Sequence, residues 1–94
     1  MSKYIVYVDD NFHYMDESQR YKQGEFDTKE EAITQCKKIV DDFFEPHLND
    51  KLSYRELWEG YMMFGEDPFI ITEDKTCQFS AWEYAKQRCR ELST

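Results

Sequence analysis

The chain has 94 residues, of which 20 are acidic and 12 are basic, and its formal net charge at pH 7 is −8. This length is enough for a single domain, residues 1–94, and too short for two independent cores. The negative charge repels nucleic-acid phosphates and anionic lipid surfaces, so we expect neither nucleic acid nor a membrane as a partner.

The first two predicted elements are strands. Residues 3–8, "KYIVYV", place β-branched and aromatic side chains at consecutive positions, which is typical of a strand covered on both faces. Residues 20–26, "RYKQGEF", are predicted to be its antiparallel partner, with Gly24 at a bulge or at a close approach of two backbones. The connection between the two strands has about eleven residues, which is long for a hairpin loop.

Residues 28–44 predict the first helix. Apolar side chains recur there at steps of three and four residues, so that one stripe of the helix is apolar and the other is charged. Thr28 and Glu31 have the spacing of a capping box, in which both side chains bond backbone N–H groups that the first turn leaves unpaired. Pro46 disfavours helical geometry at Glu45 and is predicted to end the helix.

A second helix is predicted to begin after Ser53. Ser53 and Glu56 repeat the capping box, and Leu52 is expected to contact Leu57 across it. The apolar face is predicted to consist of Tyr54, Leu57, Trp58 and Tyr61, extended by Met62 and Phe64.

Two glycines belong to this second helix. Gly65 stands where many helices end in a residue with left-handed geometry, and we expect that geometry here. Gly60 lies inside the helix, where glycine costs about 1 kcal/mol relative to alanine. Its presence therefore predicts a close contact with another backbone.

The last third of the chain predicts a strand and a helix. Residues 68–72, "PFIIT", are predicted to form a buried strand, and residues 76–79, "TCQF", a short edge strand that pairs back onto it. Ser80 and Glu83 form a third capping box at the start of the helix. The inner face of this helix is predicted to consist of Trp82, Ala85, Cys89 and Leu92.

The predicted order of elements is therefore β-β-α-α-β-(β)-α. Strands joined in a hairpin at one end, with helices gathered between and after them, favour an antiparallel sheet. The sequence predicts an α+β fold: a small antiparallel sheet of three to four strands, with three helices packed mainly on one face.

Aromatic residues are unusually frequent, with seven Phe, seven Tyr and two Trp. A domain of this size has a small interior, so some of these rings are expected to lie at the surface. Large rings that carry a hydroxyl or an indole N–H are enriched in interfaces. This excess predicts a homo-oligomer or a protein partner.

The three cysteines, Cys36, Cys77 and Cys89, form no C-x-x-C pair, which argues against a disulfide framework and a paired-cysteine zinc site. A reducing, cytoplasmic location fits this pattern. Cys36 and Cys89 lie on apolar helix stripes and are expected to be inert core thiols. The chain has no G-x-S-x-G elbow, no glycine-rich phosphate loop and no H-E-x-x-H motif, so we expect no cofactor and favour a non-catalytic protein.

The stretch "YVDDNFHYMDES", residues 7–18, is the strongest candidate site because a strand runs there into acids, rings and a histidine. The candidate binding residues are Asp9, Asp10, Phe12, His13, Tyr14 and Asp16. Two other interpretations remain open: a structural loop held by turn-forming side chains, and a metal site. The calcium-loop pattern argues against the metal, because Tyr14 stands where its glycine belongs and Arg20 where its glutamate belongs.

Three stretches, "VYVDDNFHYMDES", "FGEDPFI" and "FSAWEYAKQRC", together resemble a group of short uncharacterised bacterial proteins over nearly the whole chain. The resemblance implies a bacterial source and a stand-alone protein. It implies no activity, cofactor or catalytic residue.

Two functional hypotheses follow from these observations. The first is a small protein that acts by self-association or protein binding, through aromatic surface near the 9–19 loop and the second helix. The alternative is a small-ligand or metal-dependent enzyme that uses Asp9, Asp10, His13 and Asp16, and it requires these side chains to converge on one cleft.

Overall fold

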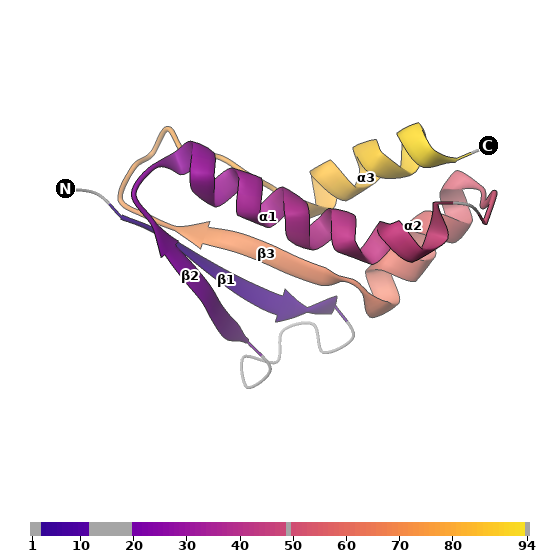
Figure 1. The fold of residues 1–94 in the computed structure, drawn as a ribbon, viewed down its shortest axis with the longest axis horizontal. Coiled ribbons are helices and arrows are strands. Elements are labelled where there is room, and N and C mark those ends of the chain that lie inside the picture. Colours follow the sequence, from indigo (N-terminus) through magenta and orange to yellow (C-terminus); the bar gives the residue numbers. More distant parts are fainter. Residues whose placement is uncertain (1–2, 12–19, 49, 94) are drawn as a thin grey trace.

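The computed structural model describes residues 3–11, 20–48 and 50–93, which form an α+β fold (Figure 1). Three strands, β1 (Tyr4–Asp10), β2 (Tyr21–Phe26) and β3 (Glu66–Ile71), make one antiparallel sheet. The helices are α1 (Lys29–Phe44), α2 (Tyr54–Phe64) and α3 (Ala81–Leu92), and a short 3-10 helix, η3 (Glu45–His47), follows α1. The predicted fold class is confirmed.

The strand order is β2-β1-β3, so β1 is the central strand and is paired on both sides. Its pairing with β2 changes register between Val6, which faces Gly24, and Tyr7, which faces Lys22. The extra residue, Gln23, makes a bulge directly next to the glycine that predicted one. Pairing with β3 runs without interruption from Ile5 to Asp10.

The predicted edge strand at 76–79 is not formed, because local side-chain bonds occupy the backbone there. Asp74 Oδ1 accepts hydrogen bonds from the backbone N–H of Thr76 at 2.9 Å and from its hydroxyl at 2.6 Å. The Asp74 carbonyl accepts from the N–H of Cys77 at 3.2 Å. Two donors that a strand would offer to its neighbour are therefore used within a turn.

The three predicted helix starts are confirmed by their caps. The hydroxyl of Thr28 accepts from Glu31 N at 3.2 Å, and that of Ser80 accepts from Glu83 N at 3.3 Å. Ser53 forms the complete reciprocal capping box with Glu56. Each cap satisfies donors that the first helical turn leaves free, so these boundaries are set locally.

The interior consists of two clusters that share α1. The first lies between the sheet and the early part of α1, and its buried members are Tyr4, Val6, Val8, Ala32, Cys36 and Ile39. The second lies among the three helices, and its buried members are Val40, Phe44, Leu57, Tyr61, Ala81, Ala85 and Cys89. Figure 1 shows α1 along the sheet, with α3 beside it and α2 at the end where β3 begins.

Most aromatic rings do not reach full burial. Among the described residues only Tyr4, Phe44 and Tyr61 are buried aromatic side chains, and the other eleven rings are half-buried or exposed. Met62 and Phe64, predicted to extend the inner face of α2, are instead 39% and 66% exposed. The helix buries only the side that Leu57 and Tyr61 occupy.

Gly65 ends α2 for a reason that the sequence does not indicate. Its φ of −79° and ψ of 178° are extended, so the predicted left-handed geometry is wrong. A Cβ atom at Gly65 would lie 2.5 Å from Tyr61 Cδ1 and 2.7 Å from the Tyr61 carbonyl oxygen. The position needs glycine because the chain turns directly against a buried ring.

Gly60 shows the opposite situation. A Cβ atom there would meet only Phe43 Cζ, at the ordinary contact distance of 3.6 Å. The predicted close contact with another backbone is therefore wrong. Glycine at this position lowers helix propensity without a steric need.

The two glycines make a matched pair for substitution. We expect Gly65→Ala to lower the free energy of unfolding by about 1 to 3 kcal/mol, because the added methyl group overpacks a buried site. We expect Gly60→Ala to raise it by about 1 kcal/mol through helix propensity. Urea denaturation of both variants beside the wild type measures these changes. Equal effects of the two substitutions would contradict the packing argument.

Candidate interaction surfaces

The end of β1 holds the described members of the predicted site. Asp9 forms a two-pronged ion pair with Arg20, with Nε–Oδ1 at 2.7 Å and Nη2–Oδ2 at 3.2 Å. Asp10 follows Asp9 within the same strand, so its side chain points to the opposite face of the sheet. The structure therefore separates these two carboxylates instead of bringing them together.

The other predicted site residues, Phe12, His13, Tyr14 and Asp16, lie outside the described residues. Their convergence with Asp9 stays a prediction. Within residues 3–11, 20–48 and 50–93, no group of three or more His, Cys, Asp or Glu side chains has an arrangement that could hold a metal ion.

Asn11 joins the end of β1 to the turn between α2 and β3. Its side-chain Nδ2 donates to the Tyr61 carbonyl at 2.9 Å, and its backbone N–H donates to the Gly65 carbonyl at 3.1 Å. The side chain is 6% exposed. Asn11 thus adds hydrogen bonds to two carbonyl groups at the end of α2, of which that of Tyr61 also accepts from the Gly65 N–H at 2.8 Å. The sequence marks it only as a polar residue after a strand.

Asp67 is a site residue that the sequence interpretation missed. It pairs in register with Asp9 across β1 and β3. Burial, and then the nearby Asp9 carboxylate, raise the pKa of Asp67 from its ordinary 3.8 to about 6, while a hydrogen bond from Trp82 acts in the opposite direction. An acid directly before the apolar run "PFII" of β3 is the signal that could have identified it.

The sheet has one face that the helices leave uncovered, and we call it the open face. Val6 and Val8 point toward α1, so the alternation of a strand sends Ile5 and Tyr7 to the other side. Their register partners there are Ile71 and Phe69. None of the four side chains that define the open face, Ile5, Tyr7, Phe69 and Ile71, belongs to either core cluster.

Contacts on the open face are ordered. The rings of Tyr7 and Phe69 stack with centroids 5.9 Å apart, and the Arg20 guanidinium lies 4.9 Å from the Phe69 centroid. Ile71 is 49% exposed. The surface therefore combines fixed rings with an exposed aliphatic side chain at the edge of the sheet.

Charged side chains border the open face as pairs of opposite sign. Arg20 pairs with Asp9 at 2.7 Å, and Lys22 pairs with Glu25 at 2.8 Å. These two pairs cancel, although the whole chain carries a net charge of −8. Asp67, the register partner of Asp9, adds one carboxylate beside these pairs, so the open face carries little net charge on a strongly acidic protein.

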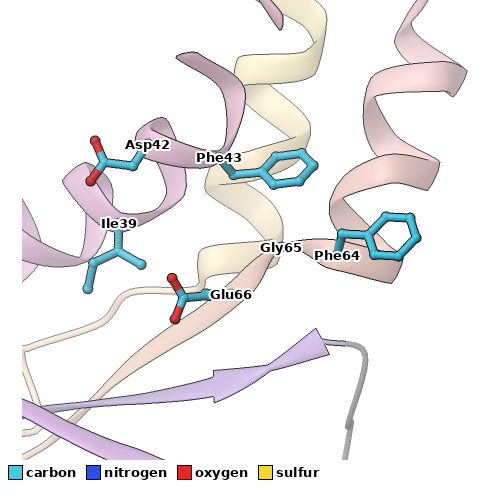
Figure 2. A pocket seen from close by; sticks show the side chains of 6 residues that line it. All are labelled: Ile39, Asp42, Phe43, Phe64, Gly65 and Glu66. Atoms are coloured by element: carbon cyan, nitrogen blue, oxygen red, sulfur yellow. The ribbon is translucent and has the colours of Figure 1, made fainter. Parts of the chain in front are cut away.

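A pocket of about 160 Å³ lies on the helical side, between α1 and the α2–β3 turn (Figure 2). Ile39, Asp42 and Phe43 line it from α1, and Phe64, Gly65 and Glu66 line it from the turn. Two aromatic rings and an aliphatic side chain line it, and the two carboxylates are directed to the side opposite the rings (Figure 2).

The three thiols are not activated nucleophiles. Burial raises the pKa of Cys36 to about 12 and that of Cys89 to about 11. Cys77 is half-buried, and burial raises its pKa too. Reactive cysteines need the opposite shift, because the thiolate is the nucleophile.

Comparison with protein-family models, with curated proteins and with solved structures gives no match. A functional assignment therefore depends on the geometry described above. None of the helices formed by the described residues has the length and apolar composition that a bilayer crossing requires.

The raised pKa of Asp67 predicts a pH dependence of stability. Below about pH 4 both the native and the unfolded chain hold this proton. Between about pH 4 and pH 6 the unfolded chain releases it while the native chain retains it, so the free energy of unfolding falls as pH rises. Above pH 6 Asp67 is ionised in both states, and the native state bears the full free-energy cost of burying its charge.

Asp67→Asn keeps the hydrogen-bond acceptor and removes the charge. We expect it to raise the free energy of unfolding at pH 7 by about 1 to 2 kcal/mol, because water partly screens this half-buried charge, and to have little effect near pH 4. Chemical denaturation at several values between pH 4 and pH 7 measures this difference, with the exposed Asp27→Asn as control. A loss of stability at pH 7 in Asp67→Asn would show that the carboxylate is stabilising. Hydrogen bonds from Thr76 and Tyr4 lower the pKa of Asp74 to about 2. The ionisation of Asp74 therefore changes the free energy of unfolding only below about pH 4.

Proposed function

We propose that the protein acts by association and not by catalysis, and that its open face binds the open face of a second copy. The observation that carries this proposal is the ordered stack of Tyr7 and Phe69, flanked by Ile5 and Ile71, on the side of the sheet opposite α1. A sheet face with aligned rings and aliphatic side chains is a surface that gains free energy when water leaves it.

Aromatic side chains support a protein partner in preference to a small ligand. Tyr and Phe are enriched at the centres of protein interfaces, where polar groups form the rim. The open face has Tyr7 and Phe69 in its middle, with the Arg20 guanidinium over the Phe69 ring and paired with Asp9. A small ligand requires concavity, and the pocket between α1 and the α2–β3 turn lies on the other side of the sheet.

The charge distribution favours a second copy over an unrelated partner. A face that meets its own image must avoid net charge, because every unpaired charge would meet a like charge near the two-fold axis. The Asp9–Arg20 and Lys22–Glu25 pairs keep the net charge of the face low on a chain with a net charge of −8, and the carboxylate of Asp67 lies at its end, beyond the Tyr7–Phe69 pair. A basic partner protein would require an acidic face, and a nucleic acid would require a basic face.

We assign this association to the cytoplasm. The three cysteines are free thiols, and two of them are buried where oxidation is slow. Unpaired thiols of this kind suit a reducing compartment.

Sedimentation velocity over a wide range of protein concentration tests the proposal. We expect the wild type to form a dimer, and Ile71→Lys to weaken dimerisation at least tenfold, which corresponds to about 1.4 kcal/mol. The reason is that the substitution adds a positive charge to an apolar position on both copies. Because Ile71 is 49% exposed, the variant should keep the wild-type fold.

Leu48→Lys is the matched control. Leu48 is 51% exposed, follows η3 and lies outside the sheet, so this variant changes the same kind of side chain on another surface. It should dimerise like the wild type. A wild type that stays monomeric at every concentration, or a dimer that Leu48→Lys dissociates as strongly as Ile71→Lys, would sink the proposal.

A further inference from the structure

We infer that the pocket between α1 and the α2–β3 turn binds a basic side chain, arginine or lysine, that a partner protein presents between apolar neighbours. This site is separate from the open face, because Ile39 belongs to the cluster on the side of the sheet that α1 covers. Its occupant therefore does not compete with dimerisation.

The size of the pocket selects a single side chain. Its volume is about 160 Å³. Sites for drug-sized molecules and cofactors usually enclose roughly 300 to 1,000 Å³, while one water occupies about 30 Å³. The pocket is thus too small for a cofactor, and it is large enough for one long side chain of a larger partner.

The lining of the pocket selects the chemistry of that side chain. Phe43, Phe64 and Ile39 offer apolar contact to an alkyl stem. Figure 2 shows the carboxylates of Asp42 and Glu66 on the side opposite the two rings, and no basic residue lines the pocket. Arginine and lysine are the side chains that combine an apolar stem with a positive head.

Both carboxylates remain able to receive a cation. Asp42 lies 3.5 Å from Lys38 on the same helix, but both side chains are more than half exposed, so water screens this pair. Glu66 accepts a hydrogen bond from the Tyr21 hydroxyl at 2.8 Å, a neutral donor that fixes the carboxylate and leaves its charge in place. An acidic partner segment would be repelled by these groups and by the net charge of −8.

The surface beside the pocket explains why the basic residue needs apolar neighbours. Met62, Met63 and Phe64 form the last residues of α2 and are 39%, 54% and 66% exposed. Methionine side chains adapt their shape to different partners, and an apolar segment on each side of the basic residue would cover them. A free amine or guanidinium ion would lack this second contact.

NMR titration of the full chain with short peptides tests the inference. The probe is acetyl-Leu-Arg-Leu-amide, and its neutral isostere acetyl-Leu-citrulline-Leu-amide is the control ligand. We expect the arginine peptide to shift the amide signals of Gly65 and Glu66 in a saturable way, and the citrulline peptide to bind at least fivefold more weakly. Equal binding of the two peptides, or no saturable shift at Gly65 and Glu66 with the arginine peptide, would overturn the inference.

Variants locate the binding site. Asp42→Asn and Glu66→Gln remove one charge each and preserve size, and each should weaken the arginine peptide about threefold to tenfold. Glu66→Gln also retains an oxygen that can accept from Tyr21. Glu59→Gln removes an equivalent charge from α2 outside the pocket, and it should leave the affinity unchanged. Equal losses in all three variants would mean that the peptide responds only to the overall charge, and the assigned site would be wrong.

Discussion

The buried ring of Tyr61 fixes the turn between α2 and β3, and the relation of the helices to the sheet depends on that turn. The ring stacks on Phe44 at 5.8 Å, and its hydroxyl donates to the Glu66 carbonyl at 2.7 Å. Its own carbonyl accepts from Gly65 and Asn11. One residue thus contacts α1, the first residue of β3 and the end of β1. Gly65, which lets the chain pass close to this ring, also lines the pocket.

The sequence predicts the helices well because their determinants are local. Thr28, Ser53 and Ser80 each sit three residues before a glutamate, and the resulting caps are independent of tertiary structure. The edge strand at 76–79 fails as a prediction because Asp74, two residues upstream of Thr76, competes for the same backbone donors. The predicted left-handed geometry of Gly65 is wrong for another reason. The Tyr61 side chain that excludes a Cβ atom there is positioned by helix packing, which no local pattern encodes.

The candidate surfaces are less predictable, because each combines residues that are distant in sequence. The sequence predicts Asp9 as a site residue, but it does not place Asp67 next to it, because that position depends on the register of β1 with β3. The excess of aromatic residues correctly indicates surface rings, yet composition alone cannot assign Tyr7 and Phe69 to a common face. Met62 and Phe64 follow the apolar spacing of α2 and are nevertheless exposed, because the core covers only the side of α2 that Leu57 and Tyr61 occupy.

The central position of β1 has a consequence for how the chain folds during synthesis. β1 is made first, and its partner β3 follows about two-thirds of the way along the chain, so closing that pairing requires a long loop. While β3 is still inside the ribosome, β1 has β2 as its neighbour and α1 as cover for Val6 and Val8. The unpaired edge of β1 is then a template for strands of other chains, and a slow ribosome would lengthen that exposure.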